Sequence, residues 1–399
     1  MTARVLVLLS QVYADGGIQR FNRTFLSACA RLGVACDVLS LGDSEASRER
    51  WAAPAGTNIR VFNHDKARFA LATAAVLLRG GHGLVIVGHV NLLTLVAAAS
   101  RLSRNRNRRL LLVAHGIEVW NGLAGRQRRA MRALDLFLCV SHYTRQTILN
   151  QVPDLPESRL QVFPNALSES WTARFNAEAC DDEGRLADLP ARYLLSVTRL
   201  DRGDRYKGIV TVLETMAMLA DSSIHYVIAG EGNDRPFLEG AAKRFGVRER
   251  VHFTGTVSDL ELVRLYRDSA AFVLPSGKEG FGIVFLEAMF FGAVVVAARE
   301  KGAVDVVRHD ETGLLVPYGD TVALKRSIDR LLSDGTLRAR LRAAGRASVV
   351  DGGPFTFDAY VARLAPVLGV TAPEIPHPEN AVNVRDMRKG AVDRRSARG

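Results

Sequence analysis

Cysteine is scarce in this 399-residue sequence, and the four cysteines lie far apart. Cys29, Cys36, Cys139 and Cys180 form no CxxC pair. This spacing argues against a zinc site or a disulfide framework, because both use paired or regularly spaced cysteines. We therefore expect free, buried thiols in a reducing compartment.

Long hydrophobic runs are also lacking. The most apolar stretch, residues 84–99, is interrupted by His89, Asn91 and Thr94, so it indicates a strand followed by a helix rather than a membrane span. The N-terminal stretch MTARVLVLLSQ is too short for a signal peptide. We expect that no segment crosses a bilayer and predict a cytoplasmic protein, which leaves peripheral attachment to the inner face of the plasma membrane open.

Two common nucleotide-binding motifs are absent. The pair Gly16-Gly17 follows the first apolar run, but the surrounding ADGGIQRF has neither the GxGxxG spacing of dinucleotide binders nor the GK[ST] of a P-loop. By itself the glycine pair predicts only a tight turn between a strand and a helix. A different Rossmann-type enzyme, such as an NAD-dependent dehydrogenase, is an alternative that the missing GxGxxG disfavours.

Positive charge is in excess: 53 Lys and Arg against 42 Asp and Glu give a formal charge of +11. Arginines gather in two stretches, Arg101–Arg109 and Arg126–Arg132. Beside apolar residues, such clusters suit an anionic membrane surface, at about 1 kcal/mol per charge; the alternative is a solvated basic face. A non-catalytic polyanion binder that recognises nucleic acid would interleave aromatic side chains, and residues 101–112 contain none. We therefore expect no nucleic-acid partner.

Short apolar runs alternate with helical patterns along most of the chain. Runs of this kind between helices predict parallel sheets covered on both faces. The pattern stops after Pro164 and restarts at Tyr193, so we expect two doubly wound, Rossmann-like α/β domains facing each other across a cleft. The predicted strands are 5–9, 34–39, 59–62, 84–87, 110–113, 136–140, 193–197, 226–229, 251–253, 271–274, 294–297 and 314–316.

The expected organisation follows from these patterns. The connection between the domains is polar and acidic, and the C-terminal tail has few large apolar residues, which is typical of disorder. Open α/β sheets bind ligands at the carboxyl ends of their strands, so the cleft is the expected ligand site. The predicted segments are a domain over 1–165, a connection over 166–190, a second domain over 191–350, a helix over 351–370 and a disordered basic tail over 371–399.

The segment SGKEGFGIVFLEAM follows a predicted strand and opens a helix. Gly280 and Gly282 allow backbone N–H groups to approach a ligand closely, and a helix N-terminus attracts phosphate. Glu287 can accept hydrogen bonds from a ribose diol, while Glu279 lies in the loop beside the ligand. The alternative is structural: one acid stabilises the helix dipole and the other lies on a solvated face.

Two further segments carry polar residues at the ends of predicted strands. SVTRLDRGDRYKGI contains Arg199 and Lys207, and a guanidinium fork with a mobile ammonium can neutralise a diphosphate leaving group without a metal. VAHGIEVW contains His115 and Glu118. A lone histidine is more often structural than catalytic, but a position at a strand end favours function. We find no convincing metal site.

Together these segments resemble the family 4 glycosyltransferases, which are retaining enzymes of the GT-B fold, over residues 1–350. The most specific match is the EGFG…E form of the E-x7-E signature, from Glu279 to Glu287. The resemblance implies transfer of a hexosyl group, with retention, from a UDP- or GDP-sugar to a glycan or polyprenyl-linked acceptor. It implies no cofactor or metal, and a role in cell-surface polysaccharide biosynthesis.

The resemblance also implies roles for individual residues. Arg199 and Lys207 would bind the donor diphosphate, and Glu287 the ribose. Glu279, beside the donor sugar, and His115, near the anomeric carbon, are the catalytic candidates. The other residues implied are Gly16, Gly17, Val257, Gly280, Phe281 and Gly282 on the donor side and Glu118 on the acceptor side.

Overall fold

The computed structural model describes residues 4–103, 105, 107–176, 189–350 and 352–372. Several predictions fall outside these residues. They are the disordered tail beyond residue 372, residues 177–188 of the acidic connection, and the positions of Cys180, Arg104 and Arg106. The other three cysteines are buried and free.

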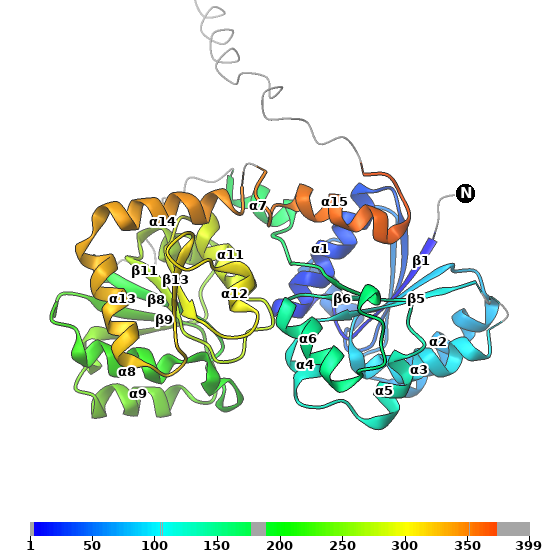
Figure 1. Ribbon diagram of the computed structural model, residues 1–399, viewed down its shortest axis with the longest axis horizontal. Coiled ribbons are helices and arrows are strands. Elements are labelled where there is room, and N and C mark those ends of the chain that lie inside the picture. The colour runs from blue at the N-terminus through cyan, green and yellow to red at the C-terminus, as the bar shows by residue number, and fades with distance from the viewer. Residues whose placement is uncertain (1–3, 104, 106, 177–188, 351, 373–399) are drawn as a thin grey trace, which may run out of the picture.

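The N-terminal half is built on a seven-stranded parallel sheet in the order β3-β2-β1-β4-β5-β6-β7 (Figure 1). The order reverses between β1 and β4, which is the switch point where Rossmann-like sheets bind ligands. The strands are β1 (Arg4–Leu9), β2 (Ala35–Ser40), β3 (Thr57–Val61), β4 (Leu84–Val87), β5 (Arg109–Ala114), β6 (Leu136–Cys139) and β7 (Leu160–Val162). The helices of this half are α1 (Gly17–Arg31), α2 (Lys66–Arg79), α3 (Val90–Arg101), α4 (Ile117–Trp120), α5 (Gly125–Met131) and α6 (His142–Gln151).

The C-terminal half repeats this plan with a six-stranded parallel sheet in the order β10-β9-β8-β11-β12-β13. Its switch point lies between β8 and β11. The strands are β8 (Tyr193–Val197), β9 (His225–Ala229), β10 (Val251–Gly255), β11 (Ala271–Leu274), β12 (Val295–Ala298) and β13 (Gly313–Val316). The helices are α8 (Ile209–Met218), α9 (Arg235–Arg244), α10 (Asp259–Asp268), α11 (Ile283–Phe290), α12 (Ala303–Val306), α13 (Thr321–Ser333) and α14 (Gly335–Ala347).

The apolar character of the strands follows from burial on both faces. In β1, Val5, Val7 and Leu9 belong to the core under α1, while Leu6 and Leu8 belong to the core under α2 and α3. Alternate residues of a strand point to opposite faces, so a strand covered on both sides is apolar throughout. The predicted α/β fold of two doubly wound parallel sheets is therefore confirmed.

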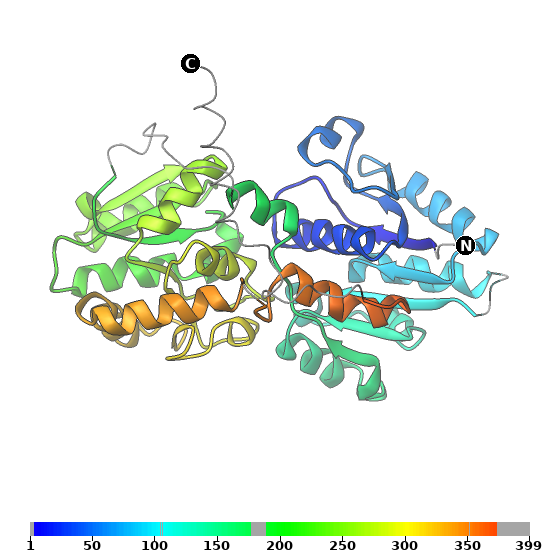
Figure 2. The same cartoon turned by 90° about the horizontal axis from the view of Figure 1, so that it is seen from above.

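Two helices connect the halves. α7 (Glu169–Asn176) lies within the stretch predicted only as a connection, and its Trp171 packs 5.6 Å from the ring of Phe290 in α11. α15 (Phe357–Leu368), which follows the second sheet, returns to the first (Figure 2). Its Tyr360 ring lies 6.2 Å from Phe21 and 4.8 Å from Phe163. The chain therefore crosses between the halves twice.

None of the helices in the described residues is both long enough and apolar enough to cross a bilayer.

Candidate functional site

The carboxyl edges of the two sheets face each other where the halves meet, and we call this region the junction. Two helices begin there after a glycine. Gly16 has φ 148° and precedes Gly17, the first residue of α1; Gly282 has φ 96° and precedes α11. Both values lie in the region that favours glycine. The unpaired N–H groups at the start of each helix attract an anion.

Two loops of the C-terminal half pack against each other at the junction. The Gly277 N–H donates to the carbonyl of Tyr206 over 2.8 Å. Gly208 has φ 79°, and a Cβ there would lie 2.4 Å from the carbonyl oxygen of Pro275. Glycine is therefore required at position 208. The loop that carries Lys207 is thereby fixed against the loop that carries Glu279.

Lys207 and Glu279 form the central ion pair of the junction. The distance from Lys207 Nζ to Glu279 Oε1 is 2.5 Å, and the two side chains are 18% and 9% exposed. Arg199 lies farther out, with a 73% exposed side chain, and its Nη2 is 3.0 Å from Asp204 Oδ2. Asp204 also accepts the Tyr206 hydroxyl over 2.9 Å. One cation thus lies inside the site and the other at its edge.

Glu287 is buried, at 2% exposure, in the second turn of α11. The Tyr266 hydroxyl donates to its Oε2 over 3.4 Å, and burial raises the pKa of Tyr266, which keeps this donor protonated. Arg20, in the first turn of α1, forms an ion pair with Glu287 from the other half of the molecule. The sequence analysis does not identify Arg20, although a cation one turn after a glycine pair was a usable signal.

His115 lies at the end of β5 and is 8% exposed. Its Nε2 is 2.9 Å from the carbonyl of Gly88. A carbonyl can only accept, so Nε2 carries the proton. Burial lowers the pKa of His115 to about 4, although the hydrogen bond to Gly88 opposes this shift. The imidazole is therefore neutral near pH 7. It packs edge-on against Phe21, with 4.9 Å between the rings.

Glu118 has a local role in this structure. Its Oε1 accepts the backbone N–H of His115 over 2.6 Å and that of Gly116 over 3.2 Å. These bonds fix the turn between β5 and α4. These contacts involve one carboxylate oxygen of Glu118, and its place on the acceptor side stays a prediction.

The two halves touch each other directly across the expected cleft. An added Cβ at Gly280 would lie 2.2 Å from the carbonyl oxygen of His115. Phe281, the next residue, is buried, and its ring lies 5.7 Å from that of Phe355. A second contact pairs His142 of α6 with Asp305 of α12. The glycine loop of one half therefore touches the histidine turn of the other.

Val257 is set apart from the ion pairs. It is half-buried just after β10, and β9 and β8 separate β10 from β11 in the sheet. At about 4.8 Å per strand, β10 lies roughly 14 Å from β11. The structure thus places Val257 just beyond the carboxyl end of β10, on the far side of the sheet from β12 and β13.

A hollow of about 280 Å³ opens beside the glycine turn, at the carboxyl ends of β1 and β2. Asp43 in its wall already accepts the N–H of Val12 over 2.6 Å and the hydroxyl of Ser40 over 2.6 Å. Polar groups from Gln11 and Arg50 also line it. Within the described residues, no cluster of three or more His, Cys, Asp or Glu side chains is arranged to hold a metal.

Comparisons with known proteins agree with this geometry. Residues 183–348 match the family described as glycosyl transferases group 1, and residues 15–170 match glycosyltransferase family 4. A GDP-mannose-dependent alpha-(1-6)-phosphatidylinositol monomannoside mannosyltransferase of Mycobacterium tuberculosis is 31% identical over 69% of this chain and 73% of that protein. An uncharacterized glycosyltransferase of Methanocaldococcus jannaschii is 31% identical, over 46% of this chain and only 47% of its own length.

The fold is also that of a solved structure. The crystal structure of Anabaena HepE in complex with UDP-glucose superimposes with a TM-score of 0.70 over 92% of this chain and 99% of that chain, at 18% identity. This likeness concerns the fold. It agrees with two Rossmann-like halves that meet at a junction.

Proposed function

This chain belongs to the group 1 glycosyltransferases, and from that premise we propose that it transfers a hexosyl group from a UDP- or GDP-sugar to a glycan or lipid-linked acceptor. The observation that carries the proposal is the junction itself. It holds the Lys207–Glu279 and Arg20–Glu287 ion pairs and the starts of two helices. Cations and free N–H groups suit a diphosphate, and a buried carboxylate suits a ribose diol.

In the proposed complex, the donor lies between the halves. Lys207 and the α11 N-terminus face the diphosphate, Arg199 closes over it from the edge, and Glu287 accepts the ribose hydroxyls. Val257, at the end of β10, borders the base. The M. tuberculosis relative is named for GDP-mannose and the Anabaena structure contains UDP-glucose, so both bases are candidates.

The proposed reaction proceeds with retention and without a metal or other cofactor. The acceptor attacks the face of the sugar from which the nucleoside diphosphate departs. Negative charge then grows on the departing diphosphate, and fixed positive groups lower the barrier by stabilising it. Neutral His115 and Glu279 flank the sugar. The hollow beside Gln11 and Arg50 is the proposed acceptor side.

Nucleotide binding is the direct test of this function. We expect UDP or GDP, and the corresponding UDP-glucose or GDP-mannose, to raise the melting temperature, because a ligand that binds only the folded state stabilises it. Glu287→Ala should abolish most of the rise, since the ribose loses its acceptor, whereas Glu300→Ala is the matched control outside these contacts. A rise with NAD and none with either nucleoside diphosphate would favour the dehydrogenase alternative.

The excess positive charge of the chain is concentrated in one stretch of the N-terminal half. Residues 66–134 contain twelve Lys and Arg and a single acid, Glu118, so this stretch alone carries a net +11. Its helices α2, α3 and α5 lie along one side of the N-terminal sheet (Figure 1). Leu71 and Leu102 are 72% and 74% exposed on this side. Arg128 and Arg129 of α5 are also exposed.

We propose that this side docks on an anionic membrane, at the inner face of the plasma membrane, and presents the enzyme to a lipid-linked acceptor in cell-surface polysaccharide biosynthesis. Not every clustered arginine takes part. Arg108 is buried, and Arg109 donates to the carbonyl of Val367 in α15. The exposed cations of α5 and the exposed leucines are the groups offered to lipid.

Vesicle sedimentation tests the docking. Wild-type protein should pellet with phosphatidylglycerol vesicles and not with phosphatidylcholine vesicles. Arg128→Glu combined with Arg129→Glu should lower the bound fraction several-fold, because each cation contributes about 1 kcal/mol near the surface. Arg267→Glu combined with Arg326→Glu, exposed changes on α10 and α13 of the other half, controls for net charge. Equal pelleting with both lipids would refute the proposal.

A further inference from the structure

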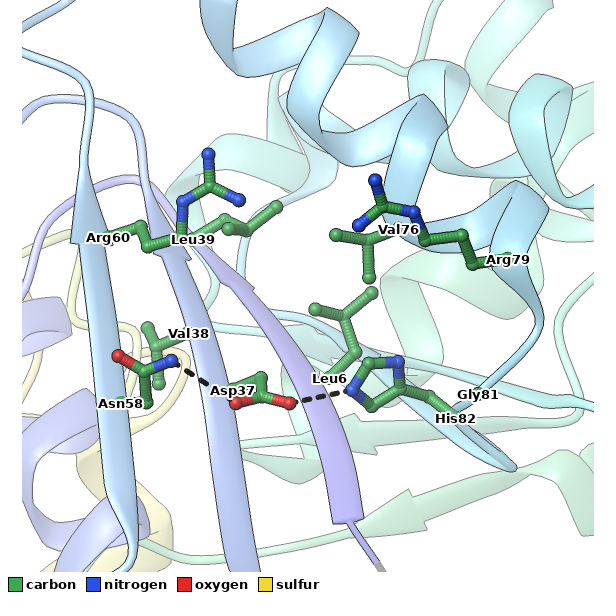
Figure 3. A pocket seen from close by; sticks show the side chains of 10 residues that line it. All are labelled: Leu6, Asp37, Val38, Leu39, Asn58, Arg60, Val76, Arg79, Gly81 and His82. Atoms are coloured by element: carbon green, nitrogen blue, oxygen red, sulfur yellow. Dashed lines mark hydrogen bonds and ion pairs between the residues drawn. The ribbon is translucent and has the colours of Figure 1, made fainter.

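A second hollow lies in the N-terminal half, away from the junction (Figure 3). It has a volume of about 320 Å³. It opens over the middle of β2 and β3, where Asp37–Leu39, Asn58 and Arg60 line it, whereas the junction lies beyond their carboxyl ends. Its lining is Leu6, Asp37, Val38, Leu39, Asn58, Arg60, Val76, Arg79, Gly81 and His82.

The hollow exists because α2 does not cover the edge of the sheet. The last turn of α2 supplies Val76 and Arg79 as one wall, and β2 and β3 supply the other. Asn58 and Arg60 are two residues apart in β3 and so point to the same face of the sheet. Leu6 and Leu39 belong to the core below. The result is an apolar back with a polar mouth.

The floor of the hollow is a hydrogen-bonded group centred on Asp37. Its carboxylate accepts Arg4 Nε over 2.9 Å, His82 Nε2 over 2.9 Å and Asn58 Nδ2 over 3.5 Å. Burial raises the pKa of Asp37, but the hydrogen bonds from Arg4 and His82 outweigh it, so the pKa is lowered overall. The negative charge of Asp37 is thus matched by Arg4, which lies outside the lining.

Arg60 and Arg79 stand on opposite sides of the mouth (Figure 3). In the part of the chain that the structure describes, neither guanidinium has a carboxylate partner. Because Asp37 is already matched, these two arginines leave the hollow with a net positive charge. Guanidinium groups present paired donors that fit phosphate oxygens.

One wall of the hollow is fixed by a buried cation. Arg108 is 9% exposed, and its guanidinium donates to the carbonyls of His82 over 3.2 Å and Leu77 over 2.8 Å. Asn105 donates to the carbonyls of Gly80 over 3.2 Å and His82 over 3.3 Å. The turn between α2 and β4 is therefore held in one conformation. A preformed wall lowers the entropy lost when a ligand binds.

From these contacts we propose that this hollow binds a phosphate group between Arg60 and Arg79, carried by a small polyol phosphate or by a lipid headgroup. The site goes beyond the proposed transfer reaction, since its lining shares no residue with the junction. The volume is at the lower end of ligand pockets, which suits a phosphorylated three- to six-carbon molecule. The apolar back packs against its carbon skeleton.

The test uses the full chain and two probes. Calorimetric titration with glycerol 3-phosphate measures binding of a free phosphate, and sedimentation with phosphatidylglycerol vesicles measures a headgroup. Arg60→Ala combined with Arg79→Ala should weaken one of them at least tenfold. Arg68→Ala, an exposed change on α2 outside the lining, should leave glycerol 3-phosphate binding unchanged and reduce vesicle binding far less.

The results with the two probes show whether the phosphate belongs to a free molecule or to a lipid headgroup. Loss of glycerol 3-phosphate binding supports a free phosphate, and loss confined to vesicles supports a headgroup. Wild-type binding of both probes by the double variant, or no binding of either probe by the wild type, overturns the proposal. The nucleotide-induced rise in melting temperature reports on the junction independently. If the double variant fails to fold, Arg60→Gln with Arg79→Gln keeps most of the side-chain volume and carries the same expectations.

Discussion

Replacing Lys207 with alanine is expected to lower kcat/KM for the nucleotide-sugar donor roughly 30- to 900-fold, which corresponds to a loss of about 2–4 kcal/mol of transition-state stabilisation. Lys207 lies inside the junction, with its Nζ 2.5 Å from Glu279. In the proposed reaction it faces the departing diphosphate, where the charge develops. The substitution also leaves Glu279 without its cation beside that charge, so both effects act in the same direction.

Steady-state kinetics with the donor identified by melting temperature measures the loss. It should appear in kcat as well as KM, because the interaction strengthens in the transition state. Arg199→Ala should act in the same direction. The matched control is Lys278→Ala, an exposed lysine in the same loop as Glu279. Near-wild-type rates for both Lys207→Ala and Arg199→Ala would contradict the proposed role of these cations.

Gly280→Ala is expected to lower kcat/KM about 100-fold, because displacements of about 1 Å can have that effect. An added Cβ would lie 2.2 Å from the carbonyl oxygen of His115. The two halves must then separate or the loop must shift. Gly280 has no positive φ among the described backbone angles, so the change acts on the contact between the halves rather than on local conformation.

Melting temperature and small-angle scattering distinguish a change in the contact between the halves from a change in local conformation. We expect a melting temperature near that of the wild type and a larger radius of gyration. Gly125→Ala is the control, because its added Cβ meets nothing within 4 Å. Wild-type activity in Gly280→Ala would mean that the observed contact does not matter for the reaction.

The regular elements were predictable because their signals are local. All twelve predicted strands are present, with ends within two residues of the prediction. The strand that the sequence does not predict is β7 (Leu160–Val162), which has only three residues and a glutamine at its centre. Too few apolar residues mark it, and its place beside β6 depends on contacts distant in sequence. The return of α15 to the first half also depends on contacts distant in sequence, since the amphipathic pattern of a helix does not specify which surface the helix packs against.

The site was predictable only in part for the same reason. Glycine turns and strand ends indicate which residues reach the junction, and Lys207, Glu279 and Glu287 do meet there. Local sequence patterns do not reveal which side chains form hydrogen bonds or ion pairs with one another. The ion pair from Arg20 to Glu287 joins the two halves of the chain, and the hydrogen bonds of Glu118 to its own turn depend on backbone geometry.

The ion pair between Arg20 and Glu287 makes donor binding an exchange of partners. The Arg20 guanidinium is paired with the carboxylate that the ribose is proposed to use, so binding of the sugar nucleotide would require this ion pair to open. The apparent affinity is then the intrinsic affinity multiplied by the fraction of molecules in which Arg20 and Glu287 are apart. Arg20 and the ribose of the proposed donor thus compete for the same carboxylate.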